Sequence, residues 1–252
     1  MITYAKYTNI GERNDNEDSI KCVYDEKKGY NFTVADGLGG HGRGKEASSL
    51  IVEIFKEEFV KDNDSDEKNT EDSYMKAFLE DAFSQSQKRL EEEQDKLNSP
   101  NELKTTAVSL VIHEDKLMWG HIGDTRLYMF NKNKIVTRTL DHSVPQMLVF
   151  AGELKEKKIR KHPDRNRLLR VLGARNVDLK VDYSSEYLIE ECQAFLMCTD
   201  GFWECITEKK MMKFLKKSKD VNEWLDMMVK EVQKNGKGTN MDNNSAIAVW
   251  VG

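Results

Sequence analysis

Aspartate ends three apolar runs of this sequence, and a fourth aspartate precedes the last apolar run. They are Asp36 after FTVA, Asp124 after GHIG, Asp200 after FLMCT, and Asp242 in MDNNS, which leads into AIAVW. A single Asp-Gly pair is most simply a turn. If the four strand ends meet at one rim of a sheet, however, their carboxylates converge, and converging carboxylates repel one another unless protons or cations neutralise them.

Oxygen ligands without a nearby His or Cys cluster select hard cations such as Mg²⁺ or Mn²⁺ over Zn²⁺. The four aspartates therefore predict a dinuclear carboxylate site. Arg13 lies in GERNDNEDS, followed closely by Glu17 and Asp18. A guanidinium beside such a centre suits a phosphate, because it donates two parallel hydrogen bonds to two oxygens. On this segment alone, a surface arginine in a charged turn is the simpler interpretation.

The glycine-rich segment ADGLGGHGRGKEAS resembles two nucleotide-binding motifs. GLGGHG satisfies G-x-G-x-x-G, but Asp36 would stand at the mouth of the pyrophosphate site, and no second strand with a ribose-binding acid follows about 20 residues on. GGHGRGK starts a P-loop pattern, but Glu46 occupies the position of the hydroxyl that must reach Mg²⁺. What remains is a turn that lets backbone approach a ligand, with the Gly37 carbonyl offered to a metal beside Asp36.

Composition narrows the class of protein. The chain has 252 residues, a net charge of -5, 38% hydrophobic and 33% charged residues, and four scattered cysteines. No apolar run approaches the ~18 residues of a membrane span, and the start, MITYAKYTNIGER, shows no export signal. These features predict a cytoplasmic protein with reduced thiols, and they argue against nucleic acid or a membrane as its partner.

The elements that must position these residues follow from hydrophobic periodicity. Two long helices, two late helices and about ten short strands suit sheet packed on sheet with helices outside. The sequence contains no internal repeat, and a single domain is the expected organisation. The expected strands cover 2–8, 19–24, 30–35, 194–199 and 245–251, and an antiparallel meander is expected from TTAVSLVIH, KLMWGHIG, TRLYMFN and KIVTRTL. The expected helices cover 45–60, 74–97, 208–217 and 221–235. A solvated loop is expected over 61–73, and short helical pieces over 142–174.

Eight motifs together resemble a known family. GERNDNED, VADGLGGHGRGKEAS, TTAVSLVI, GHIGDTRLY, DHSVPQML, HPDRNRLLRVLG, LMCTDGFWE and MDNNSAIAV occur in the order seen in the metal-dependent protein serine/threonine phosphatases of the type 2C family, most like its compact bacterial branch. The resemblance covers nearly the whole chain. It implies an α+β fold, a four-layer α-β-β-α sandwich of two antiparallel sheets, as one catalytic domain over residues 1–252 with a flap insertion at about 143–174.

The resemblance also implies roles for the residues that match the family's motifs. Two Mn²⁺ or Mg²⁺ ions, with a third in bacterial members, would bind carboxylates and one carbonyl, and an arginine would bind the phosphate. By motif position, Asp36 bridges two metals, and the neighbouring Gly37 carbonyl is a further ligand. Asp200 and Asp242 complete the coordination of the first metal, whereas Glu17 and Asp18 lie near the second. Asp124 holds a third metal together with Asp200, and Arg13 binds phosphate. The implied reaction is hydrolysis of phosphoserine and phosphothreonine monoesters by a metal-bridging hydroxide.

The sequence departs from the family's pattern in three places. One is the Gly11-x-Arg13 spacing, which is one residue tighter than in many relatives and bears on the reach of Arg13. Animal members carry a histidine after Asp-Gly that is thought to protonate the leaving group, and Leu38 occupies that position here. His41 is the nearest candidate for a general acid, with local packing in the loop as its alternative. Glu204 replaces the usual aspartate after the late Asp-Gly-aromatic run.

Alternatives and partners follow from the same residues. A catalytically silent relative that binds a partner is one alternative, against which the four aspartates argue; a nucleotide-binding module is another, disfavoured by Asp36 and Glu46. Phosphorylated proteins are the expected substrates, and a cognate serine/threonine protein kinase is the expected counterpart. The flap is rich in Lys and Arg, which suits either an acidic phosphorylated partner or simply solvated charge.

Overall fold

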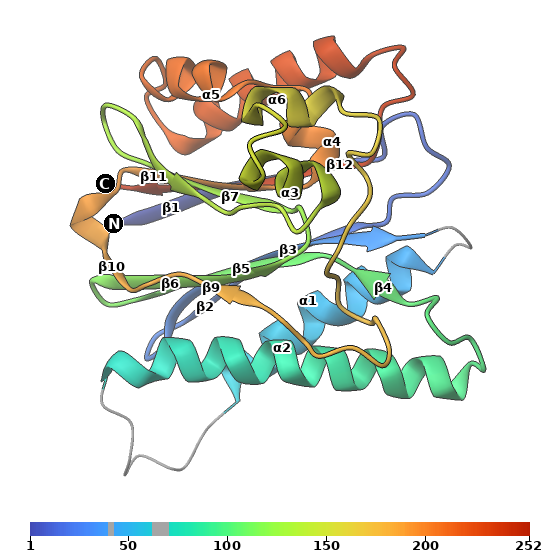
Figure 1. The fold of residues 1–252 in the computed structure, drawn as a ribbon. Helices are drawn as coiled ribbons and strands as arrows, with labels where there is room; N and C mark the ends of the chain where they lie inside the picture. The colour runs from blue at the N-terminus through green and yellow to red at the C-terminus, as the bar shows by residue number, and fades with distance from the viewer. Residues whose placement is uncertain (40–42, 62–70) are drawn as a thin grey trace.

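Two antiparallel sheets pack face to face, and helices cover their outer faces (Figure 1). The computed structural model describes residues 1–39, 43–61 and 71–252. Within these residues, one sheet has the order β1 (Ile2–Asn9), β12 (Asn244–Val251), β11 (Ala194–Cys198), β7 (Arg126–Phe130) and β8 (Ile135–Arg138). The other has the order β10 (Tyr187–Leu188), β6 (Lys116–Ile122), β5 (Ala107–His113), β3 (Gly29–Leu38) and β2 (Asp18–Asp25), with β4 (Lys104–Thr105) beside β3 and β9 (Asp182–Tyr183) beside β6.

The helices form the two outer layers. α1 (Gly44–Val60) and α2 (Glu71–Lys96) pack on the sheet that contains β3, and α4 (Asp200–Trp203), α5 (Glu208–Leu215) and α6 (Val221–Gly236) pack on the other (Figure 1). The remaining helices are α3 (Val144–Phe150) and the 3₁₀ turns η1 (Glu156–Lys161) and η2 (Ile189–Glu191). Among the described residues, none of these helices is both long and apolar enough to cross a bilayer.

Strand alternation generates three apolar layers from these elements. In β11, Phe195 and Met197 point between the two sheets, whereas Leu196 and Cys198 point toward the helices α4 to α6. A third cluster fills the space between α1, α2 and the other sheet. Strands that are buried on both faces read as continuous apolar runs, as FLMC does. The predicted α+β class and four-layer α-β-β-α sandwich are confirmed.

The segment between α3 and β9 crosses the side of the sandwich. After η1 the chain descends from the upper helical layer past β4 to β9 (Figure 1). It is attached to both halves, because Leu172 forms a β-bridge with Thr105 of β4 and Arg165 pairs with Glu204 at the end of α4. A further β-bridge joins Ser143 to Leu168. The predicted flap over 143–174 combines α3 with the first part of this segment.

The predicted four-strand meander is wrong in one respect. β5 and β6 form a hairpin in one sheet, and β7 and β8 form a hairpin in the other. The chain changes sheet at Gly123, whose φ of +100° is open to glycine, and a Cβ there would lie 2.4 Å from Thr106 Cγ2. Periodicity within each strand could not reveal that the third strand belongs to a different sheet.

Other expectations differ only at their boundaries. α2 begins at Glu71 rather than 74, and most of the predicted loop over 61–73 lies outside the described residues. β3 runs on through Asp36 to Leu38 instead of stopping before Asp36, and Asp200 starts the short helix α4. The extension of β3 follows from β4, because Gly37 and Leu38 pair with Thr105 and Lys104.

A buried ion pair joins Arg126, the first residue of β7, to Asp141, which lies shortly after β8. The guanidinium of Arg126 donates through Nε and Nη2 to the two carboxylate oxygens of Asp141, at 2.7 and 2.6 Å. Both side chains are at most 2% exposed, and the guanidinium carbon lies 3.5 Å from the centroid of the Trp203 ring. Two parallel bonds and an aromatic face satisfy a charge that would otherwise be expensive to bury.

We expect Asp141→Ala to lower the free energy of unfolding by about 3–5 kcal/mol, because it leaves the buried Arg126 guanidinium with only the more distant Glu208, 4.0 Å away, as a counter-ion. Denaturant unfolding followed by tryptophan fluorescence measures this change. Glu92→Ala is the control, since the Lys88–Glu92 pair is exposed and such pairs contribute about 0–1 kcal/mol. Equal losses for the two variants would contradict the role assigned to the buried pair.

Candidate active site

A cavity of about 500 Å³ gathers most of the residues that the sequence singled out. Its lining comes from the loop before β2, the end of β3, the turn between β6 and β7, the flap, the start of α4 and the loop before β12. The lining residues include Arg13, Glu17, Asp36, Gly37, Asp124, Asp200 and Asp242, together with Asn166 and Leu168 of the flap and Asn243. Residues up to 229 positions apart in sequence meet here, as the Arg13–Asp242 contact shows.

β3 and its neighbours place Asp36 and Gly37 at this cavity. The Gly37 N–H donates to the Glu17 carbonyl at 3.1 Å, and the Asp36 carbonyl accepts from the N–H of Thr106 at 2.9 Å. A Cβ on Gly37 would lie 2.1 Å from the Gly44 carbonyl oxygen at the start of α1. Only glycine therefore lets β3 and α1 approach this closely, which explains the glycine of the Asp36-Gly37 pair on packing grounds alone.

Asp124 and Asp200 reach the cavity from a turn and a helix start. Asp124 directly follows the Gly123 turn where the chain changes sheet, and its backbone carbonyl accepts from Trp203 Nε1 at 3.0 Å. Asp200 is the first residue of α4. Because Trp203 belongs to the same short helix, this hydrogen bond ties the positions of the two aspartates together.

The electrostatics of these carboxylates are unfavourable without a cation. Burial, reinforced by Asp18, Asp200, Asp124 and Asp242, raises the pKa of Asp36 well above its usual value. Burial, reinforced first by Asp124, does the same to the pKa of Asp200. Among the described residues, the carboxylates of Asp36 and Asp200 accept no hydrogen bond from a protein group, so their oxygens are free to serve as ligands.

Asp18 lies behind the cavity rather than in its lining. It pairs with Asp36 across β2 and β3 and is 8% exposed. One carboxylate oxygen accepts from Thr199 Oγ1 at 2.9 Å, and the other has no partner among the described residues. Burial raises the pKa of Asp18 to about 7. An orphaned buried oxygen of this kind fits a bound cation or a cation's water ligand.

Arg13 and Glu17 occupy the more open rim. Arg13 Nη2 donates to Asp242 Oδ2 at 2.8 Å, with side chains 41% and 37% exposed. Burial raises the pKa of Glu17, against a hydrogen bond from the Gly44 backbone that lowers it. Arg13 is the cation that contacts a cavity carboxylate in the described part of the chain, so the centre itself remains strongly negative.

Asn243 is a structural residue that the sequence analysis did not identify. Its Oδ1 accepts from the Glu17 N–H at 2.8 Å, and its Nδ2 donates to the carbonyls of Ile10 and Asp15 at 2.8 and 2.9 Å. One amide thus fixes the loop that carries Arg13 and Glu17 against Asp242. The MDNNS motif contained the residue, but an asparagine beside an aspartate gives no sign of its partners in sequence.

His142 is a second residue that sequence reasoning did not identify. Its Nδ1 accepts from the Gly123 N–H at 3.1 Å, and its own N–H donates to the Gly123 carbonyl at 2.9 Å. Both backbone groups of the residue before Asp124 are therefore held by one histidine at the start of the flap. Nε2 of His142 lies 3.1 Å from Asp182, which fixes the tautomer that leaves Nδ1 as an acceptor.

This arrangement argues against a separate cation site at His121, His142 and Asp182, although one ligand atom of each lies within 4.8 Å of the others. With Nδ1 accepting from Gly123, the proton of neutral His142 is on Nε2, so no lone pair faces the group. His121 Nε2 lies 2.9 Å from the Leu140 carbonyl, as its proton donor. The cluster therefore orients backbone, and His121 Nδ1 is its one imidazole nitrogen without a partner in the described part of the chain.

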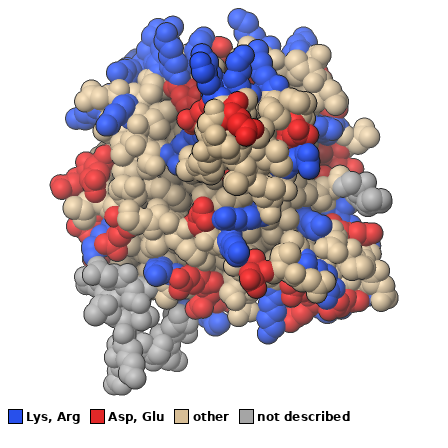
Figure 2. Space-filling view, in the orientation of Figure 1, with Lys and Arg blue, Asp and Glu red and all other residues tan. Residues whose placement is uncertain are grey.

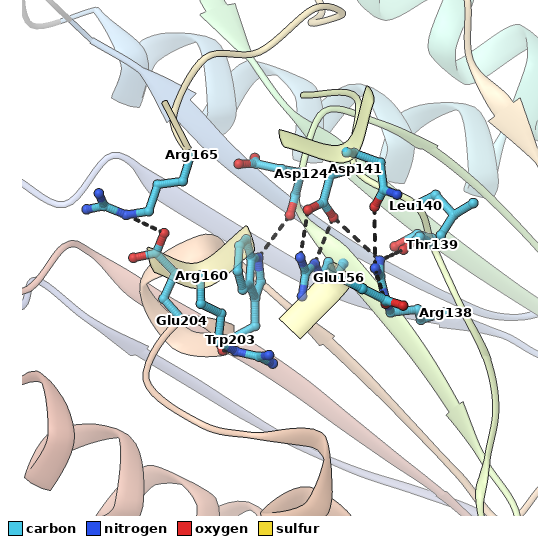
Figure 3. A network of polar contacts seen from close by, with 12 residues as sticks. Asp124, Arg138, Thr139, Leu140, Asp141, Glu156, Arg160, Arg165, Trp203 and Glu204 are labelled. Carbon is cyan, nitrogen blue, oxygen red and sulfur yellow. Dashed lines mark hydrogen bonds and ion pairs between the residues drawn. The ribbon is translucent and has the colours of Figure 1, made fainter. Parts of the chain in front are cut away.

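Figure 3 shows the polar contacts that surround Asp124 on the flap side. Asp141 lies beside Asp124, and it accepts from Arg126 and lies 3.7 Å from Arg138. Glu204 pairs with Arg165 of the flap at 2.7 Å. Burial raises the pKa of Glu204, against a hydrogen bond from Arg165 that lowers it. The position that departs from the family's aspartate thus anchors the flap beside α4.

His41, the candidate general acid, lies outside the described residues. The same holds for part of the glycine-rich segment, so the nucleotide-binding motifs are described only at their ends. The remaining residues form a set of oxygen donors without nitrogen or sulfur ligands. Such a set fits hard divalent cations, and the roles of its individual members stay predictions.

Comparisons with known proteins agree with this geometry. Residues 7–244 match the family described as Protein phosphatase 2C. The serine/threonine phosphatase stp of Listeria welshimeri is 26% identical over 230 residues, which are 91% of this chain and 88% of the relative. The crystal structure of the serine/threonine phosphatase Stp1 from Staphylococcus aureus has a TM-score of 0.88 at 22% identity and covers 100% of this chain and 96% of its own. The PstP catalytic domain in complex with 2 manganese ions has a TM-score of 0.76 at 21% identity and covers 99% of this chain and 97% of its own.

The raised pKa values predict how stability depends on pH without metal. From the usual pKa of 3.8 up to about 7, Asp18 and Asp124 keep protons in the fold that the unfolded chain has released. Since the fold binds more protons, the free energy of unfolding falls as pH rises, by at most about 1.4 kcal/mol per pH unit for each group. Thermal unfolding in EDTA from pH 4.5 to 7.5 measures this slope. With Mn²⁺ present the slope should disappear or reverse, and Asp124→Asn should flatten it in EDTA. A slope that is the same in all three samples would contradict the assignment.

Proposed function

The chain belongs to the protein phosphatase 2C family, and on this premise we propose that it is a metal-dependent protein serine/threonine phosphatase that hydrolyses phosphoserine and phosphothreonine monoesters. The observation that carries the proposal is the meeting of aspartates from both sheets in one cavity, where Asp242 alone contacts a cationic side chain, Arg13, among the described residues. The Listeria welshimeri relative, which is matched over 91% of this chain and 88% of its own length, is named a serine/threonine phosphatase.

We propose Mn²⁺ or Mg²⁺ as the cofactor, with two ions and a third site. Asp36 would be shared by two ions, and the Gly37 carbonyl would lie beside it as a further ligand. Asp200 and Asp242 would complete the ligands of the first ion, and Glu17 and Asp18 would lie near the second. Asp124 would share a third ion with Asp200. Two ions of this kind lower the pKa of water to about 7 and neutralise charge on a phosphoryl group. The orphaned Asp18 oxygen and the raised pKa values of Asp36 and Asp200, whose carboxylates burial and neighbouring negative charges disfavour, support this ligand set.

The protein's own residues would bind and orient the phosphate. Arg13 is exposed at the rim of the cavity and already bound to a carboxylate oxygen, Asp242 Oδ2. Only Nη2 of Arg13 makes this contact, and with Asp242 serving as a metal ligand both Nη groups would be available to two phosphate oxygens, which match the planar fork. Asn243 keeps the Arg13 loop in place while this exchange occurs. His41 remains the candidate that would protonate the leaving serine or threonine oxygen.

The proposal extends to the organisation and setting of the protein. Residues 1–252 would form a single catalytic domain with the flap at about 143–174, which the match over 91% of the chain supports. Phosphorylated proteins would be the substrates, and a serine/threonine protein kinase must supply them. The cytoplasm would be the location, where four unpaired cysteines stay reduced.

Asp200→Asn should abolish Mn²⁺-dependent hydrolysis while the chain stays folded, because an amide keeps the shape but removes the charge that holds the cation. We expect a loss of about 10³-fold in kcat for p-nitrophenyl phosphate and for a phosphothreonine peptide. EDTA should do the same to the unsubstituted protein. Activity near normal in the variant, or indifference to EDTA, would overturn the ligand assignment; retention of ATP without hydrolysis would favour the nucleotide-binding alternative.

Arg13→Ala should act mainly on phosphate binding. We expect KM for p-nitrophenyl phosphate to rise about tenfold or more, since a charge-assisted hydrogen bond contributes about 1.5–3 kcal/mol. Steady-state kinetics and Mn²⁺ titration by calorimetry separate the two roles. A lower affinity for Mn²⁺ with an unchanged KM would show that Arg13 supports the metal site instead.

A further inference from the structure

α5 and the turn after it carry six lysines. The sequence from Glu208 to Asp220 reads EKKMMKFLKKSKD. Its apolar residues Met211, Phe214 and Leu215 are buried against the sheet, and the lysines lie on the other side. Five of these lysines are exposed: Lys209, Lys213, Lys216, Lys217 and Lys219.

The turn η1 of the flap adds four exposed lysines to the same side: Lys155, Lys157, Lys158 and Lys161. η1 lies against the start of α5, because Arg160 pairs with Glu208 at 2.6 Å and donates to the Trp203 carbonyl at 3.0 Å. Figure 2 shows Lys and Arg gathered at the top of the molecule, over α5 and α6. We call the nine exposed lysines of η1 and α5 the lysine surface.

The lysine surface differs from the lysines of α1 and α2. There, lysines pair with glutamates three or four positions away: Lys56 with Glu53, Lys61 with Glu58, Lys76 with Glu80, Lys88 with Glu92 and Lys96 with Glu93. None of the nine lysines of the surface has an ion pair with another described residue. Residues 155–161 and 208–220 hold 11 Lys and Arg against 3 Asp and Glu, in a chain with a net charge of -5. Neighbouring like charges destabilise a fold, so this segregation calls for an anionic partner.

The lysine surface adjoins the catalytic cavity. A groove of about 620 Å³ lies beside the cavity and shares Arg13, Asn166, Asp200 and Asp242 with it. Arg160, Lys161 and Arg165 line the groove. A polypeptide that leaves the cavity through this groove therefore passes η1 and reaches α5.

We infer that the lysine surface binds an acidic segment of the phosphoprotein substrate, some residues away from the phosphorylated one. This inference rests on the proposed function and names its substrate class. An anionic membrane fits less well, because membrane-binding helices combine cations with exposed apolar residues, and the large apolar residues of α5 are buried. An acidic polypeptide needs charge alone, and steering by charge raises association rates by about 10-fold or more.

Three phosphothreonine peptides test the inference: one neutral, and two with a tail of about twelve residues rich in Asp and Glu before or after the phosphothreonine. Such a tail spans about 40 Å. One acidic peptide should show a kcat/KM about tenfold above the neutral peptide at low salt, through KM, and the advantage should shrink as salt rises. The variant Lys209→Gln, Lys213→Gln, Lys216→Gln, Lys217→Gln should lose it, with unchanged hydrolysis of p-nitrophenyl phosphate.

A matched control removes the same charge from the paired lysines: Lys56→Gln, Lys76→Gln, Lys88→Gln, Lys96→Gln. It should keep the preference. Equal turnover of all three peptides, or a preference that survives in the α5 variant, would overturn the inference. Binding to phosphatidylglycerol vesicles that the α5 variant loses, without any peptide preference, would assign the surface to a membrane instead. The affinity for an unphosphorylated acidic peptide, from fluorescence anisotropy, tests the surface even if the chain proves catalytically inactive.

Discussion

The constraint on which the rest of this structure depends is the mutual repulsion of carboxylates that both sheets bring into one cavity. Burial and neighbouring negative charges raise the pKa of Asp36 and Asp200 well above the usual range. A fold can hold such groups only if rigid surroundings prevent them from moving apart, or if protons or cations join them. The three apolar layers supply the rigidity, since Phe195 and Leu196 on opposite faces of one strand belong to different layers.

Three of the residues that position the cavity aspartates act through backbone. Asn243 holds the loop before β2, His142 holds Gly123, and Trp203 holds the carbonyl of Asp124. A backbone contact leaves the carboxylate oxygens free, whereas a contact to the carboxylate itself would compete with a cation for its lone pairs. Precise positions and unsatisfied charge are therefore compatible in the same few residues.

The sequence predicted the fold class, the long helices and the strands that carry the aspartates, because apolar periodicity is a local property that each segment displays by itself. The prediction from sequence failed where the structure depends on which strands pair with one another. The continuation of β3 to Leu38 depends on β4, and the change of sheet at Gly123 depends on packing against Thr106. The candidate site was assembled from motifs, which identify types of side chain and say nothing about partners; Asn243 and His142 matter through bonds to residues more than eighteen positions away.

The distribution of positive charge around the cavity separates two tasks. Near the centre, Arg126 is buried, and Asp141 and the Trp203 ring contact its guanidinium. Its charge is therefore paired with a carboxylate that is not in the cavity lining. At the rim, Arg13 is exposed and bound to Asp242 alone. A cationic side chain in the centre would neutralise the aspartates permanently and remove the electrostatic attraction that favours binding of a metal ion. With the Arg13 guanidinium at the rim, the centre stays negative, as a site for divalent cations requires, and the group that we propose for phosphate binding lies where an incoming dianion first meets the protein.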